Sequence, residues 1–355
     1  MHADWKSFLQ TSGAEFENDT LASFGNPEQE GQILWSGNTF CDLSPLGLIA
    51  VGGADAASFL QNQLTNDVKL VSDTSCQLTA VCTPKGRMIA ILRLFKQGDL
   101  FYLSVAAELV TPLITHLRKY VIIAIVTLQD VSDAFVHLGC SGVHIEPEVS
   151  GIAGIAAPTE PNQVATLGED MGNGFLAKIP GTIPRYEWIV PAKVGKFLWQ
   201  KLDVRCAPVG SHQWRLLDIH AGLPSVHTQT VEAFVPQMAN LHLVNAVSFT
   251  KGCYPGQEIV ARTQYLGKLK RRMYLGHVEQ GHTPKPGDDL YASIADASQA
   301  SGKVVDGQPS STGGFDLLLV TQIANVESGE IHLQDANGPI IKINPLPYAF
   351  EPEES

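Results

Sequence analysis

The residues most able to do chemistry lie in one short segment, Lys-Gly-Cys-Tyr-Pro-Gly-Gln-Glu at positions 251–258. The thiol of Cys253 lies two residues from the ammonium of Lys251, and a nearby cation favours the thiolate, which is the nucleophilic form of cysteine. Gly252 and Gly256 leave room for close approach of a partner. The segment therefore predicts a reactive thiol, with a small buried side chain in a tight turn as the alternative interpretation.

The residues that follow the thiol add further functional groups. Gln257 and Glu258 supply an amide and a carboxylate, and Tyr254 is either a turn aromatic or a stacking platform. Glu258 and Arg262 lie four residues apart, so they would form a surface ion pair if a helix begins near Pro255. We expect these residues to support the loop.

Trp214, in the run His-Gln-Trp-Arg, is a second candidate. A tryptophan near the start of a helix usually packs in a core, but its indole also stacks well on flat heterocyclic ligands. Three histidines lie in this region at spacings of eight and seven residues: His212, His220 and His227. The turn at Gly222 to Pro224 would end a helix between them, so a three-histidine metal site is not expected.

The charge balance limits the kinds of partner. The chain has 355 residues, enough for two or three packed units, and its net charge of −12 argues against broad binding of nucleic acids. Residues 251–274 are an exception, because Glu258 is their single acidic residue. The basic residues of this segment are Lys251, Arg262, Lys268, Lys270, Arg271 and Arg272. This basic island indicates an anionic ligand or partner, with a solvated strand edge as the alternative.

The six cysteines form no CxxC pair and no spacing suited to zinc or an iron–sulfur cluster, so we predict no metal site. The first ten residues lack the basic and then apolar order of a signal peptide. No apolar run reaches the length of about 18 residues that a membrane span needs. We therefore expect a cytoplasmic, reduced protein with no membrane association.

The periodicity of apolar residues predicts an α+β protein. Helices are expected at 54–64, 109–120, 194–202 and 212–221, and strands at 77–82, 88–95, 100–105 and 121–128. After Met273, six short strand candidates separated by Gly, Pro and Asp indicate a small antiparallel barrel or sandwich. Residues 1–41 are expected to be peripheral, because much of this segment is rich in Gly, Asn, Glu and Gln.

Several spaced motifs resemble one known family. The segment 251–262, Lys-Gly-Cys-Tyr-Pro-Gly-Gln-Glu-Ile-Val-Ala-Arg, is similar to the signature of the YgfZ family of folate-binding proteins. These are relatives of the aminomethyltransferase (T-protein) of the glycine cleavage system. Further similar motifs follow in the expected order, at 59–67, 82–88, 221–224, 234–241 and 345–348. The resemblance spans about residues 42–350.

The resemblance implies a T-protein-like fold, with two intertwined α+β domains and a C-terminal antiparallel β-barrel around a folate-sized opening. The expected divisions are folate-binding domains at 42–250, the Lys-Gly-Cys loop and a connector at 251–268, and the barrel at 269–350. It also implies binding of tetrahydrofolate or a one-carbon derivative. The implied role is support of iron–sulfur cluster assembly or repair, and thereby of tRNA modification, with iron–sulfur enzymes or assembly proteins as partners.

Individual residues follow from the same resemblance. Trp214 matches one folate-contacting tryptophan of the family, and the second falls at Leu46, so half of that aromatic pair is missing. Lys251 and Cys253 match the functional lysine and cysteine. The catalytic aspartate of the T-protein would fall near Ala90, where no carboxylate is present. An acidic residue that often precedes Ala-Gly is replaced by His220.

Three hypotheses of function remain open at this point. The leading hypothesis is a folate-dependent accessory protein for iron–sulfur enzymes, with Cys253 and Lys251 in the reactive loop. The first alternative is a folate-dependent aminomethyl or one-carbon transferase, which the missing carboxylate near Ala90 disfavours. The second alternative is a non-catalytic scaffold that senses folate.

Overall fold

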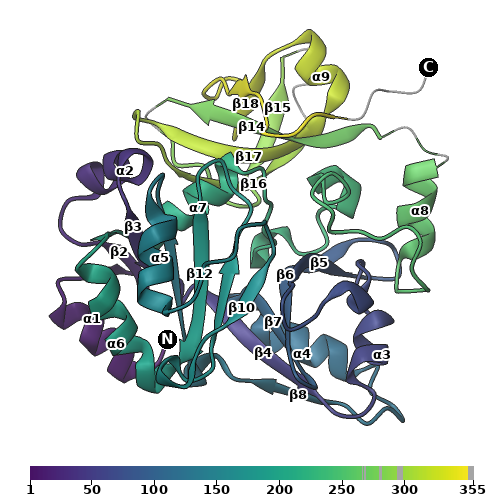
Figure 1. Ribbon diagram of the computed structural model, residues 1–355. Helices are drawn as coiled ribbons and strands as arrows, with labels where there is room; N and C mark the ends of the chain where they lie inside the picture. Colours follow the sequence, from purple (N-terminus) through teal and green to yellow (C-terminus); the bar gives the residue numbers. More distant parts are fainter. Residues whose placement is uncertain (266, 268, 280–281, 294–298, 351–355) are drawn as a thin grey trace. The chain divides into compact units, whose positions relative to one another are not determined.

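The computed structural model describes residues 1–265, 267, 269–279, 282–293 and 299–350 (Figure 1). The chain forms two compact units. The first comprises Met1–Leu60, Val68–Gln77 and Leu92–Arg215, and the second comprises Gln61–Asp67, Leu78–Ile91 and Leu216–Ser355. The chain thus passes between the units several times, and the expected mixed α+β architecture is confirmed.

The first unit contains a six-stranded sheet with the order β10-β11-β12-β9-β3-β13. Its strands are β10 (Val164–Thr166), β11 (Phe175–Lys178), β12 (Arg185–Pro191), β9 (Phe135–Ser141), β3 (Thr39–Asp42) and β13 (Ala207–Pro208). Neighbouring strands are antiparallel except β13 and β3, which are parallel. Because side chains alternate along a strand, β9 and β12 send Leu138 and Trp188 into the core and leave His137 and Glu187 on the opposite face.

Residues 1–41, expected to be peripheral, contribute to this core. They form α1 (Ala3–Thr11), β1 (Glu15–Glu17), β2 (Thr20–Ser23) and α2 (Pro27–Ser36) before β3. Trp5 and Leu9 lie four residues apart on α1, so both reach the same side of the helix and are buried with Trp199 of α6 (Ala192–Asp203). The indole nitrogen Nε1 of Trp5 also donates a hydrogen bond to Oδ1 of Asp42, at 2.8 Å.

A second sheet of the first unit pairs β7 (Leu100–Ala106) with β4 (Leu46–Gly52), and β4 with β8 (Thr127–Asp130). The later residues of β6 (Met88–Gln97) pair with β7 on its other side, and β5 (Gln77–Cys82) precedes β6 in the chain. The helices of this part are α3 (Ala56–Gln61) and α4 (Val110–Arg118), whereas α5 (Ile145–Ala153) packs into the core of the first sheet.

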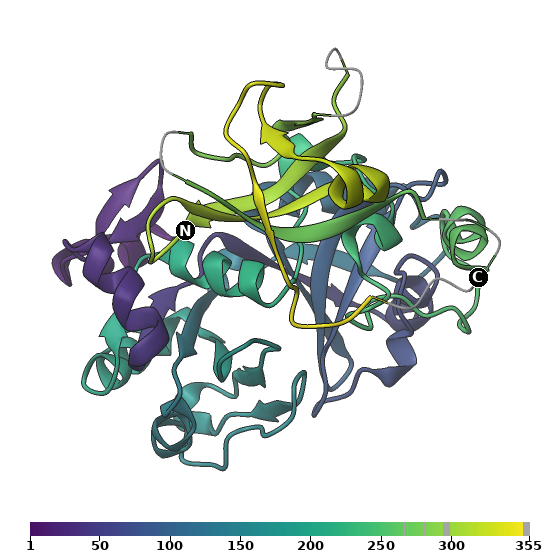
Figure 2. The ribbon, with the colours of Figure 1, turned by 90° about the horizontal axis from the view of Figure 1, so that it is seen from above.

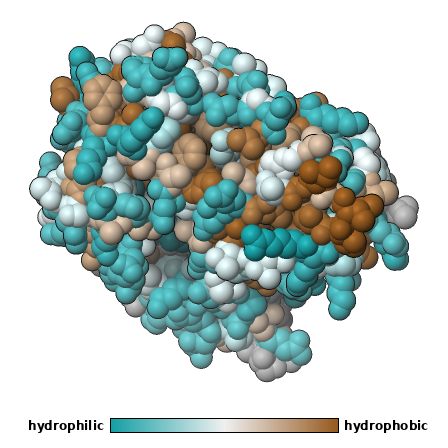
Figure 3. All heavy atoms as spheres, turned by 90° about the horizontal axis from the view of Figure 1, so that it is seen from below, coloured by the Kyte–Doolittle hydropathy of each residue, from teal (hydrophilic) through white to brown (hydrophobic). Residues whose placement is uncertain are grey.

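The strand expected at 121–128 is largely wrong. Residues 121–126 form a loop, and only Thr127–Asp130 pair with β4. Asp55 bonds to both the amide and the carbonyl of Ile125, which turns the chain before it reaches the sheet. Ile122 and Ile123 are 85% and 95% exposed. Their β-branched side chains favour a strand, but strand formation also needs a partner strand, and pairing with β4 begins only at Thr127. Figure 3, a view from below, shows apolar side chains gathered on part of the surface.

The second unit carries a six-stranded antiparallel sheet with the order β18-β15-β16-β17-β14-β19. The strands are β14 (Arg271–Val278), β15 (Asp289–Ala292), β16 (Gly302–Pro309), β17 (Phe315–Gln322), β18 (Ile331–Leu333) and β19 (Lys342–Asn344). The sheet curls into a half-barrel around its own apolar core (Figure 2). All six strands were predicted, because each alternates apolar residues between Gly, Pro or Asp turns.

The other helices are α7 (Ser211–His220), α8 (Gln257–Tyr265) and α9 (Ile323–Ser328). Short 3₁₀ turns lie at Val68–Leu70, Ala107–Leu109, Ser132–Ala134, Glu169–Met171, Thr228–Thr230 and Pro236–Ala239. Within the described ranges, no helix combines the length and apolarity that a membrane span requires.

Candidate functional site

The loop that contains Cys253 runs directly into α8 in the second unit. It packs backbone against backbone on the turn at 83–87. Gly256 has a φ of +84°, and a Cβ atom there would lie 2.5 Å from the carbonyl oxygen of Thr83. Gly86, on the other side of this contact, has a φ of +70°. Both positions favour glycine, so the loop is held in one conformation by contacts that a larger residue would break.

Lys251 anchors the start of this loop. Its side chain is buried, and Nζ donates hydrogen bonds to the carbonyl oxygens of Gln61, Leu64 and Asn66 at 2.5, 2.5 and 3.1 Å. Burial lowers the pKa of Lys251 to about 8, and the nearby carboxylate of Asp67 acts against this shift. The three carbonyl bonds also favour the charged form. All three hydrogens of the ammonium group are therefore used to fasten the loop to residues 61–67.

Cys253 is exposed, and so is Gly252 before it, whereas Lys251 and Tyr254 on either side of this pair are buried. The ring of Tyr254 is buried, with Nζ of Lys251 lying 5.2 Å from its centroid, and burial raises the pKa of its hydroxyl. A Cβ atom on Gly252 would meet no other atom within 4 Å. The other five cysteines are buried. The loop thus presents one thiol to solvent on a backbone fixed at both sides.

The remaining loop residues are placed around α8. Nε2 of Gln257 donates to the carbonyl of Lys251 at 3.4 Å, which closes the loop, while Glu258 and Arg262 are exposed one turn apart on the helix. The basic island continues into β14. Its member Lys270 is exposed, Arg272 lies over the ring of Phe350, and Lys268 lies outside the described residues.

Trp214 lies on α7 in the first unit and is only 6% exposed. Its ring packs against the backbone of β9 at Gly139, where a Cβ atom would come within 2.5 Å of Cε3 of the indole. The guanidinium carbon of Arg185 lies 4.9 Å from the ring centroid, within cation–π range. The indole is therefore wedged against a sheet and covered by a cation.

A buried polar face beside Trp214 was missed at the level of sequence. It includes Arg185 and Glu187 of β12 and His137 of β9. Nε and Nη2 of Arg185 both donate to the carbonyl of Pro180, and Oε1 of Glu187 lies 3.8 Å from Nδ1 of His137. The run Arg-Tyr-Glu-Trp at 185–188 alternates charged and aromatic residues, and this period of two could have indicated a strand with a charged buried face.

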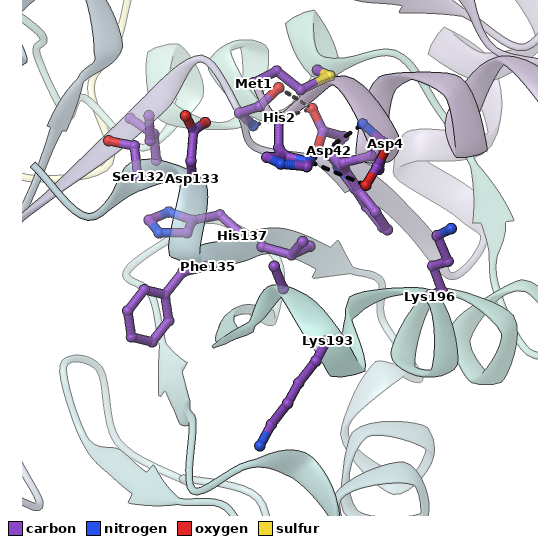
Figure 4. A pocket seen from close by; sticks show the side chains of 15 residues that line it. Met1, His2, Asp4, Asp42, Ser132, Asp133, Phe135, His137, Lys193 and Lys196 are labelled. Atoms are coloured by element: carbon purple, nitrogen blue, oxygen red, sulfur yellow. Dashed lines mark hydrogen bonds and ion pairs between the residues drawn. The ribbon is translucent and has the colours of Figure 1, made fainter.

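Leu46 is the first residue of β4 and lines a cavity of about 370 Å³ in the first unit (Figure 4). The walls come from α1, the β3–β4 turn, the start of β9 and the start of α6, and Trp214 is not among the lining residues. Two buried titratable side chains face this cavity. Burial raises the pKa of Asp42, which accepts bonds from Trp5 and Ser44, and lowers the pKa of His137 to about 4.

The positions that differ from the transferase pattern are both in the second unit. Ala90 is fully buried in β6, with no carboxylate beside it in sequence. His220 bonds through Nε2 to Oδ2 of Asp316 at 2.9 Å, and His277 bonds through Nδ1 to Oδ1 of the same carboxylate at 2.7 Å. Burial acts to raise the pKa of Asp316, but these bonds and one from Ser310 hold it below its usual value.

No group of three or more His, Cys, Asp or Glu side chains suited to a metal ion occurs among the residues that the structure describes. The candidate functional features are the thiol of Cys253 on its anchored loop, the polar face beside Trp214, and the cavity beside Leu46.

Comparison with known proteins gives consistent results. The GCVT N-terminal domain family matches residues 11–152. The tRNA-modifying protein YgfZ of Sodalis glossinidius (strain morsitans) is 30% identical over 316 residues, covering 88% of this chain and 93% of the relative. YgfZ of Edwardsiella ictaluri (strain 93-146) is 31% identical over 307 residues, covering 86% of this chain and 91% of the relative.

The aminomethyltransferase T of the glycine cleavage system from Bartonella henselae has a similar structure. Its TM-score is 0.80 with 19% sequence identity, over 97% of this chain and 96% of that chain. The expected T-protein-like fold is therefore confirmed. Together, the sequence relatives and the fold establish that the chain belongs to the YgfZ family.

Proposed function

We propose that this protein binds tetrahydrofolate or a one-carbon derivative, and that it acts as an accessory protein for iron–sulfur cluster assembly or repair. Through that role it supports tRNA modification, as the name of its relatives suggests. Its partners would be iron–sulfur enzymes or assembly proteins. The net charge of −12 favours this indirect route over direct binding of tRNA.

The exposed thiol of Cys253 carries the proposal. It is the single solvent-facing cysteine, and Lys251 and Gly256 hold the backbone on either side of it. A thiol that stays in one place at the surface is suited to react with a partner's sulfur or with a small electrophile. In this proposal Lys251 acts on the thiol by positioning the loop, because its hydrogens are already donated to backbone carbonyls.

Complementation tests the thiol. Cys253→Ala in a bacterial strain that lacks its own YgfZ-family protein should fail to restore thiolation of tRNA, measured by mass spectrometry of digested tRNA. Val204→Ala, which changes an exposed side chain of the first unit, is the matched control and should restore it. Full restoration by Cys253→Ala, with normal protein levels, would remove the thiol from the proposal.

Calorimetric titration of tetrahydrofolate tests the cofactor. The indole of Trp214 and the cavity beside Leu46 are the two candidate contacts in the first unit. We expect binding to the wild type and at least tenfold weaker binding to Trp214→Leu. Absence of binding to the wild type would overturn the cofactor part, and equal binding to both proteins would move the contact away from Trp214.

The transferase alternative is less well supported. The position near Ala90 has no carboxylate to act on the folate amine, and Ala90 itself is buried in a strand. Formation of methylene-tetrahydrofolate from a methylated amine by the purified protein would restore this alternative.

A further inference from the structure

His137 is a buried side chain whose ring nitrogens have no hydrogen-bond partner among the described residues. It is 5% exposed, and neither ring nitrogen makes a hydrogen bond within the part of the chain that the structure describes. The nearest acidic atom, Oε1 of Glu187, lies 3.8 Å from Nδ1, beyond hydrogen-bond distance. A buried imidazole without partners costs folding free energy, so the site is arranged for a group that the chain itself does not supply.

The unpartnered imidazole lines the cavity beside Leu46. Apolar side chains form much of the wall next to it, including Trp5, Phe135 and Val136. Figure 4 shows His137 and Phe135 on one side of the cavity and the lysines of α6 on another. The imidazole is neutral near pH 7, because burial lowers its pKa to about 4. It therefore offers one donor and one acceptor to a neutral polar group.

Two lysines complete the cavity. Lys193 and Lys196 lie in the first two turns of α6, where the helix dipole adds positive potential. Within the described residues neither lysine pairs with a carboxylate, although Nζ of Lys196 lies 5.5 Å from the ring of Phe8. Oδ2 of Asp4 lies 3.9 Å from Nδ1 of His2, and Oδ1 of Asp42 accepts a hydrogen bond from the indole of Trp5. Asp133 is the remaining acidic residue of the lining.

We propose that this cavity binds a small organic acid, with a neutral hydrogen-bonding head at His137 and a carboxylate beside Lys193 and Lys196. The apolar walls between them suit a flat ring or a short hydrocarbon. Neither Cys253 nor Trp214 is among the residues that line this cavity. Folates belong to this chemical class. The inference therefore rests on the proposed function where the ligand is a folate, and stands apart from it for other organic acids.

Titration calorimetry with the full chain tests the proposal with two probes. Folinic acid carries a pterin head and a glutamate, and p-aminobenzoylglutamate carries the glutamate on a single ring. We expect at least one probe to bind. His137→Leu should weaken that binding at least tenfold, and His137→Gln, which keeps a donor and an acceptor, should restore much of it.

The lysines have their own test. Lys193→Gln/Lys196→Gln should weaken binding of the same probe about tenfold at low salt, and the dependence of binding on salt should largely disappear. Lys119→Gln/Lys201→Gln removes two lysines of the same unit outside the cavity and is the matched control. Equal losses in both double variants would assign the effect to net charge and overturn this part of the proposal.

A stability measurement separates a binding role from a structural role for His137. His137→Leu should raise the melting temperature of the ligand-free protein, because it removes an unsatisfied buried group, while it abolishes the stabilisation that the probe gives to the wild type. A lower melting temperature with unchanged probe binding would show that His137 is structural.

The outcomes also separate this inference from the proposed function. Binding of folinic acid that depends on Trp214 but is unchanged in His137→Leu would overturn the inference and leave the proposed function intact. Binding of p-aminobenzoylglutamate without binding of tetrahydrofolate would keep the inference and overturn the cofactor part. Binding of neither probe at millimolar concentration would overturn the inference.

Discussion

Lys251 in the second unit and His137 in the first are both buried nitrogen bases, and they differ in what surrounds them. The ammonium of Lys251 donates to three backbone carbonyls, whereas the imidazole of His137 has no hydrogen-bond partner in the described chain. A satisfied buried cation is part of the framework, because its bonds hold two segments together. An unsatisfied buried base lining a cavity is ready for a ligand.

The two sites also differ in what they present to a ligand or partner. The Lys251 loop is closed by glycine contacts and exposes a single thiol at its surface. The His137 cavity is open space among side chains from four elements. Chemistry at the first site would occur with a partner at the surface, while the second site encloses a small molecule. Stability and labelling experiments can test whether the Lys251 loop and other bonded buried charges hold the fold in place.

The largest expected effect is that of Lys251→Met. The variant keeps the length of the side chain but leaves the carbonyls of Gln61, Leu64 and Asn66 without their donor. We expect the free energy of unfolding in urea to fall by about 3 kcal/mol. Lys270→Met, at an exposed position, is the control and should change it by less than about 0.5 kcal/mol. A small effect of Lys251→Met would mean that the three hydrogen bonds of Lys251 contribute little to stability, and that Lys251 does not differ from His137 in this respect.

Gly256→Ala comes next. The added Cβ would lie 2.5 Å from the carbonyl oxygen of Thr83, at a φ of +84° that disfavours alanine. We expect a loss of about 2 kcal/mol in unfolding free energy. Gly252→Ala, four residues earlier, adds a Cβ in open space and is the matched control. If the two variants were equally stable, the loop would not be held by its contact with the turn at 83–87.

A smaller effect is expected from Asp316, another buried charge with partners. Its pKa is below the ordinary value of 3.8, so the folded state holds this proton more weakly than the unfolded state. Its contribution is therefore present above pH 3.8 and is lost as the pH falls through the folded-state pKa. Asp316→Asn should lower stability by about 1 kcal/mol at pH 6, and the difference from wild type should shrink in acid.

Thermal unfolding between pH 2.5 and 6 measures this difference. Asp133→Asn, an exposed acid of the first unit, is the control and should show little dependence on pH relative to wild type. A stability difference for Asp316→Asn that stayed constant across this range would mean that the hydrogen bonds of His220 and His277 do not depend on the carboxylate charge.

The smallest effect on stability is expected from alkylation of Cys253. Iodoacetamide should label one thiol in the native protein, since the other five are buried, and all six in urea. Because the side chain is exposed, labelling should leave the melting temperature nearly unchanged. Mass spectrometry of the labelled peptide checks the position. Rapid native labelling of a second cysteine would mean that burial does not protect the other thiols and that Cys253 is not distinguished by its exposure.

Local signals in the sequence predicted much of the fold. The strands of the C-terminal sheet alternate apolar residues between turn residues, and Cys253 with its glycines stands in one contiguous motif. The failures have a common cause. The run 121–128 has strand-forming residues, but pairing with β4 begins only at Thr127. On α1, Trp5 and Leu9 alone are too few to indicate an apolar helix face that packs in a core. Their burial depends on α6, which lies far along the chain.

The sequence by itself determined the family, the α+β class and the location of the Lys-Gly-Cys loop, because these depend on motifs and on periods of a few residues. Only the tertiary structure decided what Lys251 and His137 do. The bond from Lys251 to Gln61 spans 190 positions, and the burial of His137 depends on strands and helices that meet only after folding. No local pattern encodes whether a buried nitrogen will find its partners, since those partners arrive from distant parts of the chain.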